Sequence, residues 1–199
     1  MAQLTTVDVD VLMRKLIPSA VAVLGTFPAD KVPSTSLVEQ QPSCFVLNTH
    51  PEGQPGEHWL AFYYDGRGTL EYFDSYGMSL EVHAHVHRAI ASCGLLSMCK
   101  RANVEMLQSS VTAACGQYCV LFLYWRAKHM LAPVSQFADW VKLCGSASVA
   151  VDRDVFVVRQ LGRLVARCTL PPAPAAPRPS VPSSWSSLCR VQTCHCRCI

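Results

Sequence analysis

Cys115 is the residue of this chain whose type and surroundings best suit covalent chemistry. It stands between a loop of small residues, 110–114, and an apolar segment, 116–125, that is typical of a buried helix. Unpaired backbone N–H groups and the positive end of the dipole at a helix start favour a thiolate over a thiol. A thiolate nucleophile still needs a base, and the oxyanion that it creates needs hydrogen-bond donors. Other elements of the chain must supply these partners.

Three further residues are candidates for those roles. His58 lies in one predicted strand and Asp74 ends the next, with a short turn between the two strands that predicts an antiparallel hairpin. In such a hairpin the Asp74 carboxylate can accept the imidazole N–H and orient the ring. Gln108, seven residues before Cys115, can place a side-chain amide beside the Cys115 N–H. The four residues together predict a thiol acyl-transfer site.

The elements that must position these residues predict an α+β domain, in which a small antiparallel sheet packs against a central helix carrying the nucleophile. Apolar residues at helical spacing predict helices over 6–17, 79–92, 115–130, 134–143 and 152–167. Aromatic and β-branched runs predict strands over 44–49, 57–64 and 69–74, and a further strand over 102–108. The apolar segment 20–27 is assigned to neither type.

Length and composition fit one domain with a tail. The chain has 199 residues, of which 50% are hydrophobic and 16% charged. Residues 1–169 form the predicted catalytic domain. Residues 170–199 begin with a proline-rich stretch that cannot pack a core, so we expect a disordered tail.

The distribution of charged residues does not indicate a protein whose main role is to bind nucleic acid. Three of the 17 Lys and Arg residues lie in the tail, which leaves residues 1–169 balanced against all 14 Asp and Glu residues. No run of basic residues occurs in the sequence. We therefore expect at most a weak contact with DNA, and we expect a monomer.

Eleven cysteines would indicate disulfides in a short secreted chain, but the N-terminus lacks the basic and apolar regions of a signal peptide. Most cysteines before residue 170 stand among apolar residues, as buried free thiols do. The longest apolar run, 111–125, is too short to span a bilayer. We therefore expect an intracellular protein that is neither secreted nor membrane-bound.

Three other patterns favour structural explanations. His83 and His87 share a helix face, but no third ligand is identifiable, so we interpret them as a solvated surface and expect no metal. The cysteines at 194–198 do not have zinc-finger spacing. Cys119 lies one helical turn beyond Cys115, where the dipole is weaker, and is a weaker candidate for the nucleophile.

Three segments carry a resemblance to a known family. They are Glu57-His-Trp-Leu-Ala-Phe62, Tyr72-Phe-Asp-Ser-Tyr-Gly77, and Gln108 followed by Cys115-Gly-Gln-Tyr-Cys119. As a set they resemble the adenovirus-type cysteine protease (adenain) family, and particularly its members in Maverick/Polinton-like elements and adintoviruses. The resemblance covers roughly residues 4–168, and the tail lies outside it.

The resemblance implies a papain-like, adenain-type fold and a role for each residue. His58 is then the general base, Asp74 its orienting carboxylate, Cys115 the nucleophile and Gln108 the oxyanion donor. Adenoviral members usually carry Glu at the position of Asp74, whereas SUMO proteases of the same broad fold carry Asp. The seven-residue step from Gln108 to Cys115 follows the adenoviral pattern, because SUMO proteases typically have six.

The resemblance also implies substrates, cofactors and a location. Adenoviral relatives cleave capsid and core precursor proteins at small, often glycine-containing sites, inside host cells and in virions. They are stimulated by DNA and by a viral peptide that attaches through a cysteine. The sequence itself requires no cofactor, and Cys99 is only near the position of the peptide-binding cysteine. Two alternatives stay open: a deconjugating isopeptidase for a ubiquitin-like modifier, and an inactive, domesticated binding module.

Overall fold

A five-stranded mixed sheet organises the fold. The computed structural model describes residues 3–37, 40–133 and 135–169. The strands lie in the order β1 (Ala22–Phe27), β2 (Ser43–Asn48), β3 (Trp59–Tyr64), β4 (Leu70–Phe73) and β5 (Cys99–Arg101). The inner pairs β2–β3 and β3–β4 are antiparallel, as predicted, whereas the outer pairs β1–β2 and β4–β5 are parallel. The α+β class is confirmed, with a sheet that is wider than expected and only partly antiparallel.

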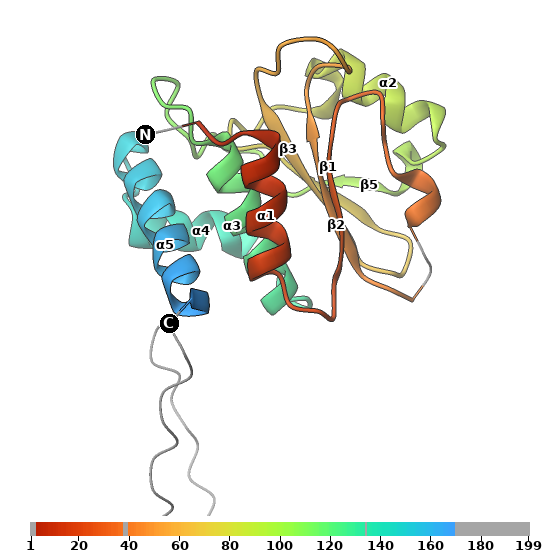
Figure 1. Cartoon of the computed structure of the whole chain (residues 1–199). Helices are drawn as coiled ribbons and strands as arrows, with labels where there is room; N and C mark the ends of the chain where they lie inside the picture. The colour runs from red at the N-terminus through yellow and green to blue at the C-terminus, as the bar shows by residue number, and fades with distance from the viewer. Residues whose placement is uncertain (1–2, 38–39, 134, 170–199) are drawn as a thin grey trace, which may run out of the picture. The chain divides into compact units, whose positions relative to one another are not determined.

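The described residues form five α-helices, each overlapping a segment where one was predicted. These are α1 (Thr6–Leu16), α2 (Ala84–Ser92), α3 (Cys115–Lys128), α4 (Ser135–Cys144) and α5 (Ala150–Thr169); α4 and α5 extend past the predicted ends. A 3-10 turn, η2 (Leu80–Val82), precedes α2, and two more are η1 (Ser34–Ser36) and η3 (Leu96–Met98). Figure 1 shows α1, α3, α4 and α5 on one side of the sheet and α2 on the other.

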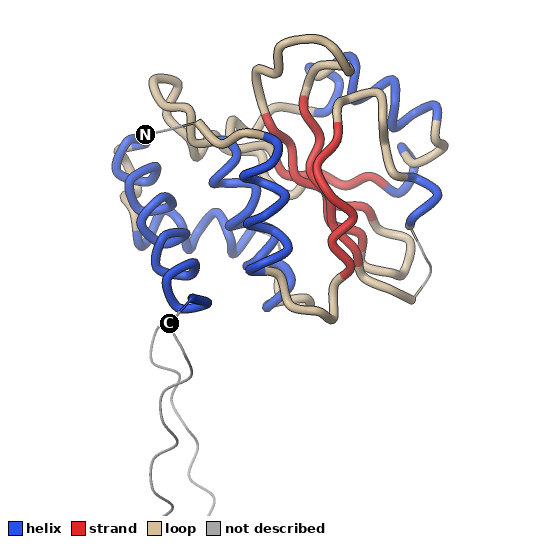
Figure 2. The backbone as a smooth tube through the Cα atoms, viewed as in Figure 1, coloured by secondary structure: helices blue, strands red, loops and turns tan. Residues whose placement is uncertain are grey.

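Side-chain alternation along β3 builds a hydrophobic core on each face of the sheet. Trp59, Ala61 and Tyr63 belong to the cluster that contains the buried residues of α3, α1 and α5. Leu60 and Phe62 belong to the cluster that contains Val86 and Ile90 of α2. Successive strand residues point to opposite faces, so a strand buried on both sides reads as a continuous apolar run. Figure 2 shows the helices covering both faces of the twisted strands.

The helix α3 is buried along most of its length between the sheet and the other helices. Its far end is fixed by Arg126, which donates from Nε and Nη2 to the two carboxylate oxygens of Glu71 on β4, at 2.6 and 3.0 Å. Both side chains are largely buried. A two-point ion pair fixes direction as well as distance, so it sets how α3 lies across the strands.

Two strand assignments made from the sequence differ from the structure. Segment 102–108 is not a strand; β5 precedes it, and the N–H groups of Leu107 and Gln108 both donate to the Ser75 carbonyl instead of to a strand ladder. Segment 22–27, left unassigned, is the edge strand β1, whose register shifts between Val23 and Gly25. Neither feature follows from local periodicity, because distant backbone groups decide the pairing.

The predicted tail, residues 170–199, lies outside the described residues and stays a prediction. Residues up to Thr169 form one compact unit. Among the residues described, no helix combines the length and apolar character needed to cross a bilayer.

Candidate active site

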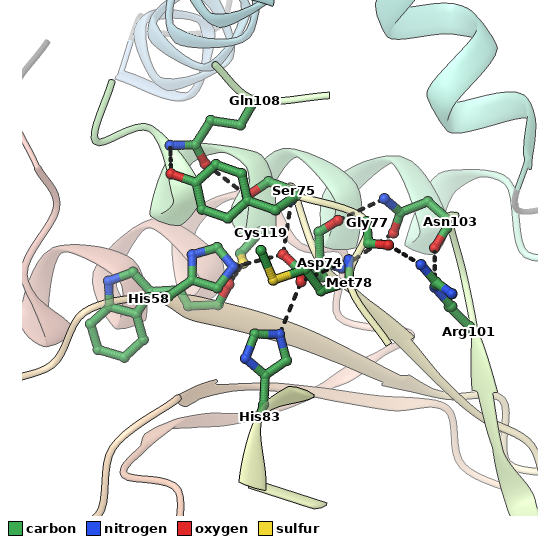
Figure 3. Close-up of polar contacts among 12 residues, drawn as sticks. His58, Asp74, Ser75, Gly77, Met78, His83, Arg101, Asn103, Gln108 and Cys119 are labelled. Carbon is green, nitrogen blue, oxygen red and sulfur yellow. Dashed lines mark hydrogen bonds and ion pairs between the residues drawn. The ribbon is translucent and has the colours of Figure 1, made fainter. Parts of the chain in front are cut away.

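The β3–β4 hairpin brings His58 and Asp74 into contact at one end of the sheet. His58 directly precedes β3 and Asp74 directly follows β4, and the antiparallel register pairs Ala61 with Phe73. His58 Nε2 lies 2.7 Å from Asp74 Oδ1 (Figure 3). His58 is 8% exposed and Asp74 is 1% exposed. The contact predicted from the hairpin is therefore present, and it is shielded from water.

The hydrogen bond defines the protonation pattern of the His58 ring. A carboxylate oxygen only accepts, so the proton of this bond resides on His58 Nε2 and leaves Nδ1 as the exchangeable nitrogen. Burial lowers the pKa of His58, but the hydrogen bond to Asp74 and the proximity of Asp74 and Cys115 outweigh it and raise this pKa to about 9. The imidazolium form is thus favoured at neutral pH.

Cys115 is the first residue of α3 and lies beside His58. Ala114, at the helix N-cap, has no side chain able to cap the first turn, so the N–H groups there have no capping partner from this residue. His58 Nδ1 is buried and makes no hydrogen bond of normal geometry with a described residue. One helical turn beyond Cys115, the Cys119 thiol donates to the carbonyl of Trp59, the residue that follows His58, so α3 begins beside the His58 ring. The arrangement suits proton exchange between sulfur and Nδ1.

The Asp74 carboxylate accepts four hydrogen bonds. Oδ1 accepts from His58 Nε2 and from the Tyr76 N–H at 2.9 Å, and Oδ2 accepts from the Met78 N–H at 3.1 Å and from His83 Nε2 at 3.0 Å. Burial raises the pKa of Asp74, but hydrogen bonds from His58 and His83 keep it well below its usual range. Asp74 is therefore a fixed anion beside His58.

The interpretation of His83 from the sequence was wrong. The side chain of His83 is only 9% exposed, and it donates to Asp74 instead of facing solvent. His83 and His58 approach Asp74 from two directions in Figure 3. The described residues contain no group of three His, Cys, Asp or Glu side chains suited to a metal ion.

The turn that carries Asp74 is braced by Arg101, the last residue of β5, and by Asn103, which follows that strand. Asn103 Oδ1 accepts from the Asp74 N–H at 3.2 Å, and Asn103 Nδ2 donates to the Asp74 carbonyl at 2.6 Å. Arg101 donates to the Gly77 carbonyl and to the Asn103 carbonyl. The parallel pairing of β4 with β5 brings these residues alongside the turn. No local pattern in the sequence marks Asn103 for this role.

Gln108 lies in the same network but is not hydrogen-bonded to Cys115 in the described part of the chain. Its Oε1 accepts from Ser75 Oγ at 2.7 Å, and its Nε2 donates to the Thr112 carbonyl at 2.7 Å and to Tyr76 Oη at 3.3 Å. The side chain is fully buried. Both amide hydrogens therefore have partners in this structure, and its role as an oxyanion donor stays a prediction.

Asp154 of α5 holds the loop between Gln108 and Cys115. This carboxylate is fully buried and accepts from the Ser109 N–H at 3.1 Å, from Thr112 Oγ1 at 2.6 Å and from Tyr118 Oη at 2.9 Å. Because Tyr118 belongs to α3, one carboxylate joins the closing helix, the loop and the helix that begins at Cys115. No local pattern in the sequence marks Asp154 for this role, since its partners lie about 40 residues away.

The other buried cysteines are poor nucleophiles. Burial raises the pKa of Cys119 well above its usual value, and its thiol donates to the Trp59 carbonyl. Burial also raises the pKa of Cys44 to about 12. Neither thiol has the buried His58 imidazole as a partner. The preference for Cys115 over Cys119 as the candidate nucleophile therefore has a physical basis in the structure.

Two solved structures are similar to this chain at low sequence identity and with TM-scores below 0.5. The central domain of the uncharacterized Lpg1148 protein from Legionella pneumophila is 17% identical, with a TM-score of 0.49, over 82% of this chain and 99% of that one. The Chlamydia trachomatis effector Cdu1 bound to ubiquitin is 19% identical, with a TM-score of 0.44, over 66% of this chain and 65% of that one.

Curated relatives come from adenoviruses. The protease of porcine adenovirus A serotype 3 is 31% identical over 123 residues, which are 56% of this chain and 59% of the relative. The protease of frog adenovirus 1 is 36% identical over 93 residues, 42% of this chain and 46% of the relative. The match thus spans about half the length of each relative.

The family model described as adenovirus endoprotease matches residues 23–154, about two thirds of the chain. This range includes His58, Asp74, Gln108 and Cys115. The match confirms the resemblance and the adenain-type fold; the narrower link to Maverick/Polinton elements or adintoviruses stays a prediction. The chain belongs to the adenovirus endoprotease family.

Proposed function

We propose that this protein is a cysteine endopeptidase with Cys115 as nucleophile, His58 as base and Asp74 as the orienting carboxylate. The observation that carries the proposal is the buried 2.7 Å contact between His58 Nε2 and Asp74 Oδ1, with Cys115 beside the same ring at the start of α3. A nucleophile, a base and a group that orients the base are the minimum set for thiol acyl transfer.

The first half-reaction uses the two nitrogens of His58 differently. Nδ1 takes the proton of the Cys115 thiol, while Nε2–H stays bonded to Asp74. The thiolate attacks the peptide carbonyl carbon, and the new C–S bond and the old C–N bond coexist in a tetrahedral intermediate. The C–N bond then breaks, and Nδ1–H gives its proton to the leaving amine. The product is a thioester on Cys115.

The second half-reaction restores the enzyme. Nδ1 removes a proton from water as the water oxygen attacks the thioester, and the proton returns to sulfur when the C–S bond breaks. The Cys115 N–H lies in the first helical turn, where no intrahelical carbonyl is available to it, and is a donor for the oxyanion. Gln108 supplies a second donor when Nε2 exchanges its bond with the Thr112 carbonyl for one to the oxyanion.

The substrates proposed are precursor proteins encoded by a virus or a virus-like element, cut at small or glycine-containing sites inside the host cell or the virion. This scope rests on membership of the family. The residues of the site supply the nucleophile, the base and the charge stabilisation, so the proposed chemistry requires no further group. Stimulation by DNA or by a viral peptide is a separate proposal. It is tested by adding DNA or the peptide to the cleavage assay described below.

Thiol labelling tests the site without knowledge of the substrate. The protein is treated with iodoacetamide near neutral pH, and labelled cysteines are mapped by mass spectrometry in wild type, His58→Ala and His85→Ala. His85 is exposed on α2 and serves as the matched control. We expect Cys115 to label before the exposed Cys144 and Cys168, and only His58→Ala to slow it.

Substrate assays then separate the three functions. An endopeptidase cuts glycine-containing peptides, and Cys115→Ala abolishes the cut. An isopeptidase leaves these peptides intact and needs a folded ubiquitin-like conjugate. Equal labelling of Cys115 in wild type and His58→Ala, at a rate no faster than that of Cys144, would rule out a thiolate–imidazolium pair. That result would favour the binding-module alternative.

A further inference from the structure

Asp74 is shared between two imidazole rings, and only one of them belongs to the proposed triad. His58 occupies Oδ1 at 2.7 Å and His83 occupies Oδ2 at 3.0 Å. The two rings lie 5.8 Å apart between centroids and are inclined by 30° (Figure 3). Because a carboxylate oxygen only accepts, each ring donates an N–H from Nε2. One negative charge therefore serves two donors.

The η2 turn places His83 close to the Asp74 carboxylate. The Leu80 N–H donates to Tyr72 Oη at 3.0 Å, which ties the η2 turn to the last part of β4. Leu80 is buried in the core beneath α2, and the His83 N–H donates to the Leu80 carbonyl at 3.0 Å. The turn that precedes His83 is therefore anchored to Tyr72, which lies two residues before Asp74 in the chain.

Groups other than His83 also hold Asp74 in position. The N–H groups of Tyr76 and Met78 bind one carboxylate oxygen each, and Asn103 holds the Asp74 backbone from both sides. His83 differs from these groups because it donates a second side-chain N–H, besides that of His58, to the Asp74 carboxylate. Its effect should therefore be electrostatic and transmitted through Asp74.

We propose that His83 is a positioning residue that shares the Asp74 carboxylate with His58 and so limits how strongly that carboxylate retains the His58 imidazolium proton. This inference rests on the proposed function, because it concerns the same Cys115–His58 pair.

The physical reason is competition for one anion. A hydrogen bond to the charged form of a carboxylate stabilises that form and draws charge toward the donor, so less is available to a second partner. In proteolysis the imidazolium must also release its proton to the leaving amine, and an imidazolium held too strongly is a poor general acid. His83 would therefore keep His58 basic enough to accept a proton and acidic enough to return it.

Two other ionisable groups lie close to His58. Cys115 of α3 acts on His58 directly, and the Tyr76 ring lies 4.8 Å from the His58 ring between centroids. Both are present in every variant of the experiment below. Differences in pH dependence between wild type and the His83 variants therefore result from the substitution of His83.

Iodoacetate provides a readout that does not depend on a peptide substrate. This anionic reagent is attracted by the imidazolium, so alkylation of Cys115 should slow as His58 loses its proton. In wild type we expect this alkaline decline near pH 9, where the His58 pKa lies.

The full chain is compared as wild type, His83→Leu and His83→Gln. His83→Leu removes the N–H donor and keeps the bulk of the side chain, whereas the amide of His83→Gln can still donate to Asp74. His85→Leu, the same exchange at an exposed position in the first turn of α2, is the control.

The expected result is a decline that moves to higher pH by about half a unit or more in His83→Leu, in keeping with the loss of one hydrogen bond to a charged group. His83→Gln and His85→Leu should remain close to wild type. With a cleaved peptide, kcat of His83→Leu should fall about three- to tenfold while KM changes little, as expected for a weaker general acid.

Two outcomes would overturn the inference. They are an unchanged alkaline decline in His83→Leu, and a decline that moves to lower pH, which would mean that His83 only orients Asp74. If His83→Leu fails to fold, His83→Asn replaces it, because the shorter amide cannot reach Asp74 and the same shift is required of it. Failure of the proposed function would look different, since Cys115 of wild type would then show no alkaline decline and no preferential labelling.

Discussion

Asn103 holds the Asp74 backbone on both sides, accepting from its N–H at 3.2 Å and donating to its carbonyl at 2.6 Å. One amide side chain thus closes the turn that aims the carboxylate at His58. The same Nδ2 also donates to the Glu105 carbonyl at 3.0 Å, which joins this turn to the segment leading to Gln108. The carboxylate is therefore positioned by a residue that has no chemical role itself.

Replacement of Asn103 by Ala should lower activity more than its effect on stability explains. We expect a loss of about 1–3 kcal/mol in the free energy of unfolding, because buried backbone groups lose their partners. We expect kcat/KM to fall by at least about tenfold, since a carboxylate that is poorly aimed no longer orients the base. Denaturant unfolding and peptide kinetics measure the two effects.

Asp65→Ala is the matched control for Asn103. It removes side-chain bonds to the N–H groups of Arg67 and Thr69 in the turn at the opposite end of the same hairpin. It should cost stability with little change in the kcat/KM of the folded protein. An equal fall in kcat/KM in both variants would contradict a specific role for Asn103.

Gly77→Ala should damage the same turn by a steric route. Gly77 has φ +64°, and an added Cβ would lie 2.5 Å from the Glu105 carbonyl carbon. Gly94 has φ +72° with no atom within 4 Å of its Cβ position, so Gly94→Ala carries only the cost of the backbone conformation, about 1 kcal/mol. We expect Gly77→Ala to lower the unfolding free energy by clearly more than Gly94→Ala and to reduce activity. Equal values from thermal or denaturant unfolding would contradict this account.

Asp154→Ala should loosen the loop that precedes the nucleophile. Three donors, Ser109 N–H, Thr112 Oγ1 and Tyr118 Oη, would lose their buried acceptor, at a cost of about 2–4 kcal/mol. The neighbouring Asp152 is exposed, so Asp152→Ala should be close to neutral. Denaturant unfolding measures both. A neutral result for Asp154→Ala would show that α5 does not secure this loop.

The pH dependence of stability should reveal the His58–Asp74 pair. The folded-state pKa of His58 is raised from 6.5 to about 9, so its contribution is fully present below pH 6.5 and is lost as the pH rises through about 9. The folded-state pKa of Asp74 is lowered from 3.8, so its contribution is present above that value and is lost as the pH falls below it. The pair is therefore most stabilising between about pH 4 and 6.5.

Comparison of wild type with Asp74→Asn tests this window. The difference between their unfolding free energies should be largest near pH 5–6 and should narrow toward pH 9, because the amide carries no charge to retain the His58 proton. Urea unfolding at several pH values gives the measurement. A difference that stays constant from pH 5 to pH 9 would mean that the pair does not couple to folding.

Local patterns in the sequence were sufficient for the five helices, for strands β2, β3 and β4, and for the contact between His58 and Asp74. A helix start after small residues placed Cys115, and a hairpin with a short turn placed His58 opposite Asp74. Both signals are short-range: helical periodicity, strand alternation and turn length operate within about 20 residues. Family membership, found from the motifs around these residues, is confirmed over 23–154.

The tertiary structure alone decided which groups hold these residues in place. His83 belongs to a pattern that suits an exposed helix face, and only the anchoring of Leu80 to Tyr72 brings it to Asp74. Asn103 and Asp154 reach their partners across 29 and about 40 residues of chain. Pairing of the outer strands likewise depends on distant backbone. The physical reason is that hydrogen bonds between buried polar groups are fixed by where the packed core brings backbone and side chains together, and no local periodicity in the sequence records this.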